Sequence, residues 1–167
     1  MIYSIQSIAP VCAKLNATGR KLVLATGFFD LLHSEHVNFL VKAKAAGDVL
    51  IVAVESDERA RALKGEGRPV ETQSIRCQHI LDLTGKLENW ETGLLVLALP
   101  SDFNNFAAYD SLMSAISPQI YAVSSQANHL KSKTFLVEKY GGKLVVVHEL
   151  NPEISTTKIL TSDAYRL

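Results

Sequence analysis

Two histidines three residues apart, His33 and His36, are the side chains whose type and spacing point most directly to chemistry. They open an amphipathic stretch that follows the apolar run from Leu22 to Ala25. A strand is therefore expected to turn into a helix here, and a helix start presents unpaired N–H groups and a positive dipole end to an anion. Side chains three apart share one helix face. The pattern predicts a phosphate-binding turn with both histidines toward one ligand.

The residues just before the histidines suit such a turn. Gly27 is expected to supply a tight turn, because glycine adopts backbone angles that are closed to other residues. Phe29 is expected to pack under the loop, and Asp30 to brace it by accepting hydrogen bonds from backbone N–H groups. Two histidines also suit a metal, but zinc takes three or four protein ligands and no nearby Cys or His completes the set. We therefore expect no metal site of that kind.

Residues 26–36 read TGFFDLLHSEH, which resembles the G-x-F-D-x-x-H-x-G-H motif of the H-x-G-H nucleotidyltransferases. These are small cytidylyl- and adenylyltransferases, and some of them act on glycerol-3-phosphate or heptose phosphate. The resemblance implies transfer of CMP or AMP from a nucleoside triphosphate, carried with Mg²⁺, to a small phosphorylated acceptor, with release of pyrophosphate. It implies that His33 and His36 donate to the triphosphate. It also implies that the turn Gly27, Phe28, Phe29 and Asp30 contacts the nucleotide.

Two further segments carry the resemblance. The segment ISTTKI from Ile154 matches the family's I-S-T-T-x-I, in which Ser155, Thr156 and Thr157 would open a helix and offer donors to phosphate. Taken alone, this cluster is equally well an ordinary helix cap. The loop KGEGRPVET from Lys64 matches L-K-G-x-G-R-P-V, so Lys64 would reach the phosphates and Arg76 would be a further phosphate partner. Without the family, Lys64, Arg68 and Arg76 are interpreted as solvated surface charges.

Three departures from the family pattern fall where its members contact substrate. Glu35 replaces the glycine of H-x-G-H, Val123 begins VSSQAN in place of K-G-x-D, and Leu150 begins LNPE in place of R-T-x-G. A carboxylate facing an anionic ligand would weaken binding by about 1–4 kcal/mol. Two functions therefore remain open. One is a divergent nucleotidyltransferase, and the other is a catalytically impaired homologue that serves as a nucleotide-binding or regulatory module.

The hydropathy pattern predicts the fold that would position these residues. Five short apolar blocks are expected to be strands, and amphipathic stretches between them are expected to be helices. Such alternation predicts a doubly wound, Rossmann-like α/β domain, with a five-stranded parallel sheet and helices on both faces. We expect a leading segment over 1–20 and the nucleotidyltransferase-like domain over 21–167. The expected strands are Lys21–Ala25, Val49–Val54, Leu94–Leu99, Ile120–Val123 and Leu144–Val147.

The composition of the chain limits the classes of partner that we expect it to bind. The chain has 167 residues, with 17 basic and 17 acidic side chains and no basic run suited to a nucleic acid. The longest apolar run, from Gly93 to Pro100, is too short to cross a bilayer, and the N-terminus lacks the pattern of a signal peptide. We therefore expect a cytoplasmic protein with neither nucleic acid nor membrane as partner. Because related enzymes are often dimers, a homodimer is a further expectation.

Overall fold

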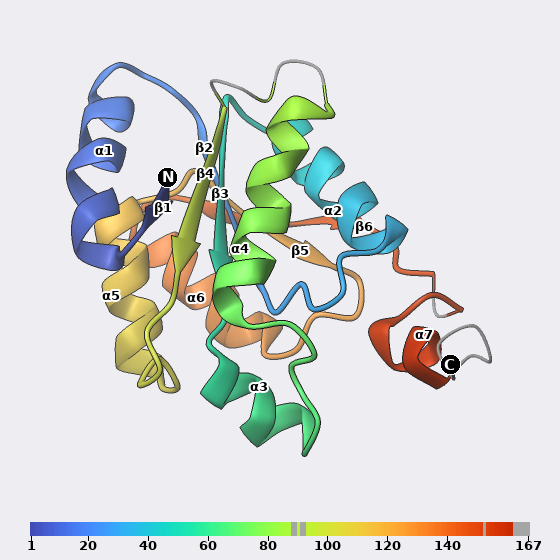
Figure 1. Ribbon diagram of the computed structural model, residues 1–167. Coiled ribbons are helices and arrows are strands. Elements are labelled where there is room, and N and C mark those ends of the chain that lie inside the picture. Colours follow the sequence, from blue (N-terminus) through green and yellow to red (C-terminus); the bar gives the residue numbers. More distant parts are fainter. Residues whose placement is uncertain (88–89, 91–92, 152, 162–167) are drawn as a thin grey trace.

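The computed structural model describes the whole chain except residues 88–89, 91–92, 152 and 162–167 (Figure 1). Its strands are all parallel and form a single six-stranded sheet in the order β1-β4-β3-β2-β5-β6. The doubly wound α/β prediction is confirmed, and the five expected strands are present. The strands are β1 (Ile2–Tyr3), β2 (Leu22–Gly27), β3 (Val49–Val54), β4 (Leu94–Ala98), β5 (Ile120–Ser124) and β6 (Lys143–His148).

The strand count of the prediction is corrected from five to six by β1. Ile2 and Tyr3 pair with Val96 and Leu97 of β4, so the start of the leading segment extends the sheet edge. A strand of two residues is too short to show an alternating hydropathy pattern, so no strand was expected there. The helix that follows, α1, carries the buried side chains Ile8 and Cys12.

Six α-helices and one short 3-10 turn lie between the described strands, and a seventh helix follows β6 (Figure 1). Local sequence fixes several of their starts, since Ser56, Thr72 and Asn105 each accept a backbone N–H from the first turn. The helices are α1 (Ile5–Ala17), α2 (Ser34–Ala45), α3 (Asp57–Lys64), α4 (Gln73–Leu81), α5 (Phe106–Ile116), α6 (Leu130–Lys139) and α7 (Thr156–Thr161), and the 3-10 turn is η1 (Asp82–Gly85).

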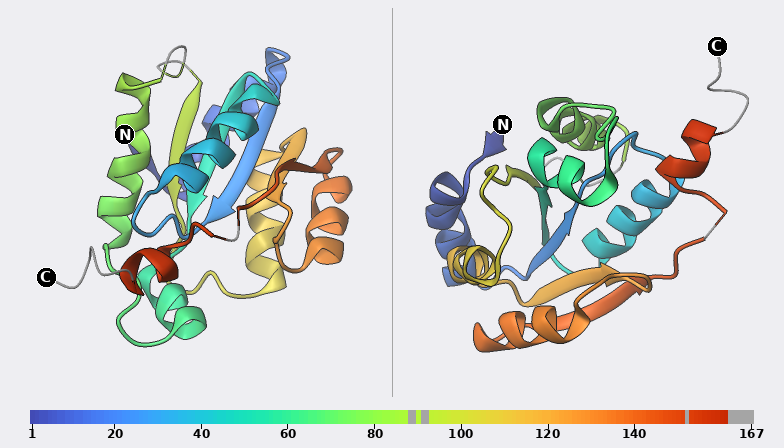
Figure 2. Two further views of the ribbon diagram at one scale, coloured as in Figure 1. Left: turned by 90° about the vertical axis from the view of Figure 1, so that its right-hand side faces the viewer. Right: turned by 90° about the horizontal axis from the view of Figure 1, so that it is seen from below.

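Two hydrophobic clusters hold the layers together, one on each face of the sheet. Helices α1, α5 and α6 pack against one face, around Leu112, Met113 and Leu136. Helices α2 and α4 pack against the other face, around Leu40 and Ile80. The central strand β3 is buried at every position, as expected for a parallel strand covered on both sides. The two views in Figure 2 show the sheet between these helix layers.

The strand order reverses between β2 and β5, and this point positions the candidate site. From β2 the chain proceeds through β3 to β4 on one side, and β5 and β6 then add on the other side. Only Val23–Leu24 pair with Ile120–Tyr121, although β2 continues to Gly27 and β5 to Ser124. A crevice therefore lies beyond the carboxyl ends of these strands, where doubly wound sheets bind ligands.

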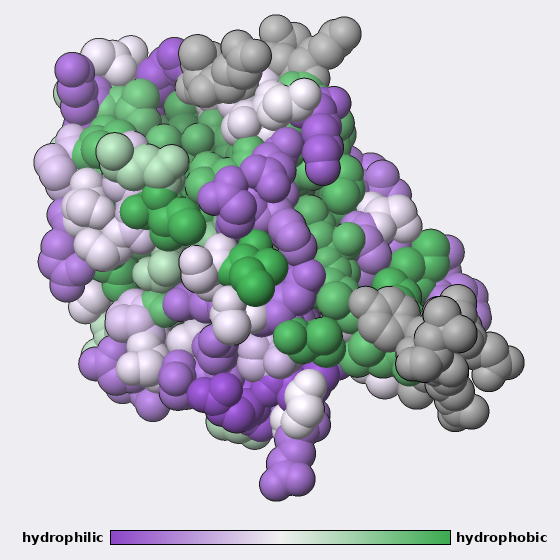
Figure 3. Space-filling model, in the orientation of Figure 1, coloured by the Kyte–Doolittle hydropathy of each residue, from purple (hydrophilic) through white to green (hydrophobic). Residues whose placement is uncertain are grey.

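Helices α3 and α7 lie at the same end of the molecule as the carboxyl ends of the strands (Figures 1 and 2). In the orientation of Figure 1, hydrophilic residues gather along this lower edge, around α3 (Figure 3). Among the helices of the described residues, none is both long enough and apolar enough to cross a membrane.

Candidate active site

A pocket of about 520 Å³ lies at the reversal of strand order. Its wall combines the end of β2, the turn into α2, the end of β5 and the segment after β6. Segments far apart in the sequence thus meet at one place, as the motif order predicts. Of the predicted site residues and the three departures, the lining includes Gly27, Phe28, Phe29, Asp30, His33, Glu35, His36, Lys64, Val123, Leu150, Ser155, Thr156 and Thr157.

The turn that leaves β2 is shaped by a buried aromatic ring. Phe29 is only 4% exposed and has a positive φ of 52°, and Leu31 follows with a φ of 48°. The expectation that Phe29 packs under the loop is confirmed. The reason given for Gly27 is wrong, because the positive φ angles fall on Phe29 and Leu31. A Cβ at Gly27 would lie 3.0 Å from the Phe29 ring, so glycine is needed here for close approach.

Asp30 braces this turn, as expected, and links it to the loop after α3. Its carboxylate accepts from the backbone N–H groups of Val70, at 3.0 Å, and Glu71, at 3.1 Å. Its Oδ2 also accepts from Arg68 Nε at 2.8 Å. Asp30 is 2% exposed, so this ion pair is shielded from water. The interpretation of Arg68 as a solvated surface charge is therefore wrong.

The two histidines stack against each other at the start of α2. Their ring centroids are 3.8 Å apart and their planes differ by 18°. Burial, reinforced by the neighbouring His33, lowers the pKa of His36 to about 3, and burial also lowers the pKa of His33. The Nδ1 atoms of both rings are buried and have no hydrogen-bond partner among the described residues. The rings are therefore neutral at pH 7, and their Nδ1 atoms make no hydrogen bond with the described residues.

The Ser-Thr segment before and within α7 reaches the same turn. Thr156 is 8% exposed, and its Oγ1 donates to the backbone carbonyl of Asp30 at 2.8 Å. Ser155 Oγ accepts from the backbone N–H of Lys158 at 3.2 Å, so Ser155 caps the helix. Ser155 therefore caps the helix, and the cluster lies beside the histidine turn; its role as a donor to phosphate stays a prediction.

The two cations expected at the phosphates have different positions. Lys64 ends α3 and lines the pocket, with its Nζ 5.9 Å from the centroid of the Phe28 ring. Arg76 is 0% exposed and lines no part of the pocket. Its guanidinium donates to the carbonyls of Phe28, Glu55 and Glu71 and to Asp57 Oδ1. The expectation that Arg76 is a phosphate partner is thus wrong, and so is the alternative of a solvated charge.

Glu35 does not present a bare carboxylate to the pocket. The expectation that an unscreened negative charge faces an anionic ligand is therefore corrected. The side chain is 6% exposed, and its Oε2 accepts from the backbone N–H of Asn151 at 2.9 Å. The same atom lies 3.0 Å from His148 Nε2. The hydrogen bonds from Asn151 and then His148 hold the pKa of Glu35 below its usual range. The negative charge of Glu35 is therefore stabilised by hydrogen bonds from Asn151 and His148.

A second pocket of about 520 Å³ adjoins the first and contains residues that the sequence patterns did not identify. Tyr109 donates to Glu55 Oε1 at 2.6 Å, and Arg59 Nε lies 3.2 Å from Glu55 Oε2. Burial raises the pKa of Glu55 and lowers that of Lys133. Glu55, Tyr109 and Lys133 lie outside the segments that matched the family, so only the folded chain reveals this cluster.

The two pockets share a boundary at which two lysines lie. Lys64 and Lys133 line both pockets, together with the end of β2 and Asn128. The loop after β5 itself contributes neutral side chains to the first pocket, among them Gln126 and Asn128. Lys133 comes from α6, eight residues beyond Ser125, where no motif would suggest it. Among the described residues, His33 and His36 belong to no group of three or more potential metal ligands.

Comparison with known proteins now decides the family. The profile described as cytidylyltransferase-like matches residues 24–162. The chain belongs to the cytidylyltransferase-like family. This match includes the histidine turn, both shared lysines and the Ser-Thr segment.

Curated relatives of this cytidylyltransferase-like chain carry the name bifunctional protein HldE. The relative from Desulfatibacillum aliphaticivorans is 30% identical over 161 residues, which is 93% of this chain and 29% of the relative. The relative from Alcanivorax borkumensis is 32% identical over 150 residues, which is 86% of this chain and 28% of the relative. The chain thus spans less than a third of the length of these two relatives.

Solved structures support the fold of the cytidylyltransferase-like chain. A lipopolysaccharide core biosynthesis protein from Thermoplasma volcanium has a TM-score of 0.58 and 22% identity, covering 80% of this chain and 98% of that one. Pantoate-beta-alanine ligase from Francisella tularensis has a TM-score of 0.62 and 12% identity, covering 98% of this chain and 74% of that one. At these identities the likeness concerns the fold alone.

Proposed function

We propose that this chain transfers CMP or AMP from a nucleoside triphosphate to a small phosphorylated acceptor and releases pyrophosphate. The observation that carries the proposal is the stacked pair of His33 and His36, whose buried Nδ1 atoms have no partner among the described residues. The pair faces a pocket at the reversal of strand order, as a nucleotide site in this fold requires. Membership of the cytidylyltransferase-like family supports the reaction class.

In the proposed reaction, an oxygen of the acceptor's phosphate attacks the α-phosphorus of the triphosphate. A new P–O bond forms while the bond from the α-phosphorus to the bridging oxygen breaks, and pyrophosphate leaves with the electron pair. Negative charge grows on the phosphoryl oxygens, so fixed N–H donors stabilise the transition state. Neutral imidazoles are suitable donors, and Lys64 at the pocket edge adds a positive charge.

The second pocket is the proposed place of the acceptor. It shares Thr26, Gly27 and Phe28 with the first pocket, so ligands in the two would meet at the end of β2. Arg59 and Lys133 offer cations to a phosphate, and the buried Glu55 offers an acceptor to a hydroxyl group. Lys133 lines both pockets and is therefore the proposed contact to the phosphate that becomes bonded to the nucleotide.

Mg²⁺ is proposed to enter with the nucleotide. Two carboxylates that line the first pocket, Asp30 and Glu35, already accept hydrogen bonds from nitrogen donors. Because these two carboxylates are already hydrogen-bonded, they fit a metal that is held mainly by phosphate oxygens and water. This is the usual arrangement for Mg²⁺ with nucleotides. When bound, the ion neutralises part of the phosphate charge.

A turnover assay tests the proposal. Purified chain is incubated with Mg²⁺, CTP or ATP and a panel of sugar and polyol phosphates, and pyrophosphate release is measured. We expect release with one nucleotide and a subset of acceptors, and a loss of at least about a hundredfold in His33→Ala and His36→Ala. His79→Ala is the control, because His79 is a half-buried histidine on α4 that lines neither pocket.

One observation favours a second function, a nucleotide-binding module without turnover. The loop after β5 presents neutral side chains where the related enzymes have a lysine and an aspartate. The same assay separates the two functions. Nucleotide binding without pyrophosphate release for any acceptor would favour the module, whereas release that depends on both histidines supports the enzyme.

A further inference from the structure

Glu35, Lys42 and the sequence-distant His148 form a continuous polar chain beside the proposed nucleotide pocket. Lys42 Nζ lies 3.0 Å from His148 Nδ1, and His148 Nε2 lies 3.0 Å from Glu35 Oε2. Lys42 and Glu35 belong to α2, whereas His148 is the last residue of β6. His148 and Glu35 are 6% exposed, so their contact is shielded from water.

The order of these groups fixes the direction of the hydrogen bonds. A lysine ammonium group has only donors, so His148 Nδ1 must accept from Lys42. The Nε2–H group of His148 then donates a hydrogen bond to the Glu35 carboxylate. Lys42, His148 and Glu35 thus form one hydrogen-bonded chain with a basic group at one end and an acidic group at the other, so a charged group takes part in each hydrogen bond. Such bonds are the stronger kind in proteins.

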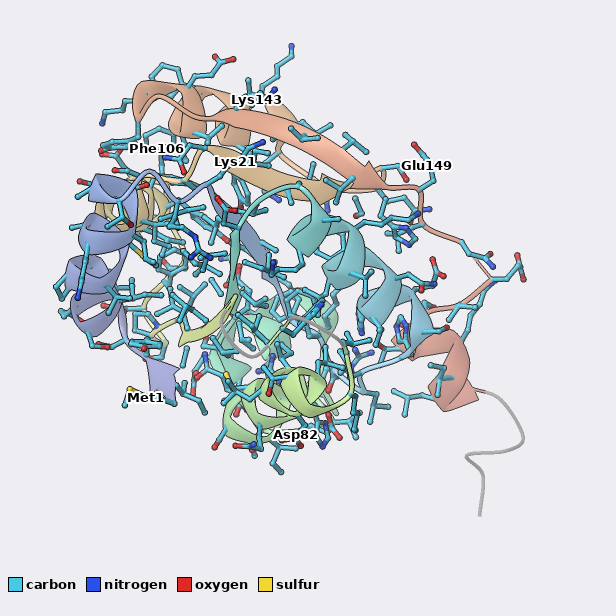
Figure 4. All side chains as sticks on the ribbon, turned by 90° about the horizontal axis from the view of Figure 1, so that it is seen from above. Met1, Lys21, Asp82, Phe106, Lys143 and Glu149 are labelled. Carbon is cyan, nitrogen blue, oxygen red and sulfur yellow. The ribbon has the colours of Figure 1, made fainter. Side chains whose placement is uncertain are left out.

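The same carboxylate also holds the backbone beyond β6. Asn151 N–H donates to Glu35 Oε2 at 2.9 Å, and Leu150 N–H donates to Ser125 Oγ at 3.2 Å. From Glu149, labelled just past the end of β6 in Figure 4, the chain leads toward α7. This is the segment that brings Ser155 and Thr156 to the histidine turn.

We propose that Glu35 is a positioning residue, which anchors the segment after β6 so that Ser155–Thr157 close the nucleotide pocket. The inference rests on the proposed function for its ligand. It gives a physical role to two departures from the family motif at once. The glutamate that replaces the glycine of H-x-G-H binds the backbone of the segment that lacks the family's R-T-x-G.

Hydrogen exchange and nucleotide binding together test this role. The variant Glu35→Gly is compared with Ser34→Gly, which puts the same flexible residue on the exposed neighbouring position of α2 and lines neither pocket. In Glu35→Gly we expect exchange in peptides covering 149–151 and 153–160 to quicken at least about tenfold, the loss expected for one charge-assisted hydrogen bond. Exchange in β3 should match that of the control.

Binding of CTP and ATP with Mg²⁺, measured by calorimetry, provides the second readout. We expect the dissociation constant of the preferred nucleotide to rise at least about fivefold in Glu35→Gly and to change less than twofold in Ser34→Gly. Should Glu35→Gly fail to fold, Glu35→Gln keeps the shape, removes the charge and should quicken the same exchange about threefold or more.

The outcomes separate the inference from the proposed function. Unchanged exchange after β6, or tighter nucleotide binding in Glu35→Gly, would overturn the positioning role. If the natural chain binds neither nucleotide, the proposed function fails, and the exchange of 149–160 still decides whether Glu35 holds this segment.

Discussion

The imidazole rings of His33 and His36 stack 3.8 Å apart, centroid to centroid, at the start of α2. A proton on one ring would repel a proton on the other, and burial disfavours either charge. The pair is therefore neutral when the pocket holds no anion. A triphosphate in the pocket would raise both pKa values, because a nearby negative charge favours the protonated form.

The first prediction concerns the pH dependence of stability. The pKa of His36 is about 3 in the folded chain and about 6.5 when unfolded, so the unfolded state binds more protons between these values. Folding stability from this group is present above pH 6.5 and is lost as the pH falls below it. From pH 7 to pH 5 the loss is about 2 kcal/mol. Urea unfolding at both pH values measures it.

The variant His36→Gln should lose less stability than the natural chain over the same pH interval. The control is His79→Gln, which removes a half-buried histidine on α4 outside the pocket. An equal slope in all three proteins would show that His36 is not a buried neutral base.

A second prediction concerns the close approach of Gly27 and Phe29. The variant Gly27→Ala adds a Cβ 3.0 Å from the Phe29 ring, which must then shift. We expect stability to fall by about 1–3 kcal/mol, measured by thermal unfolding. Adding Phe29→Leu should recover part of this loss, because the smaller side chain makes room.

The matched control for that substitution is Gly85→Ala, since a Cβ at Gly85 meets no atom within 4 Å. Its expected effect is below about 0.5 kcal/mol. Strictly additive losses in Gly27→Ala and Phe29→Leu would argue against the steric explanation.

A third prediction follows from the buried guanidinium of Arg76. Its N–H groups donate hydrogen bonds to three backbone carbonyls and to Asp57. The substitution Arg76→Met therefore leaves several polar groups unpaired. We expect a loss of about 3–5 kcal/mol in urea unfolding. Arg61→Met removes an exposed ion pair with Glu58 and should cost less than about 1 kcal/mol. Similar small losses in both variants would contradict a structural role for Arg76.

A fourth prediction tests Lys133 at the boundary of the two pockets. Lys133→Met should lower kcat at least about tenfold, with a smaller change in KM for the nucleotide, if its charge acts mainly on the reacting phosphates. Lys131→Met is the control, because Lys131 is exposed on the same helix and lines neither pocket. A rise in KM alone, with kcat unchanged, would restrict Lys133 to binding.

The sequence was sufficient for the layers of the fold. The apolar blocks of β2 to β6 alternate with amphipathic helices, and this periodicity depends on local residues alone. The resemblance to the family motifs, and not periodicity, placed the turn at Gly27–Asp30 beside the Ser-Thr segment. The two-residue strand β1 was missed, because its pairing with β4 is a long-range contact without a local pattern.

Charged side chains were the least predictable part of the site. Arg68 was interpreted from its residue type, and Arg76 from its type and from the family resemblance. The structure instead encloses Arg76 in carbonyl groups and pairs Arg68 with Asp30. Glu35 was expected to repel an anion. Its hydrogen-bond partner His148 lies 113 residues away in the sequence. Partners of this kind are brought together only by the tertiary fold.

The central claim is that the pocket of His33 and His36 binds a nucleoside triphosphate, and calorimetric titration tests it most directly. The purified chain is titrated with CTP and with ATP, each with Mg²⁺, alongside the double variant His33→Asn/His36→Asn. The account predicts binding of one nucleotide by the natural chain, weakened at least about tenfold in the double variant. Binding that is equally tight in both proteins, or absent from the natural chain, would contradict it.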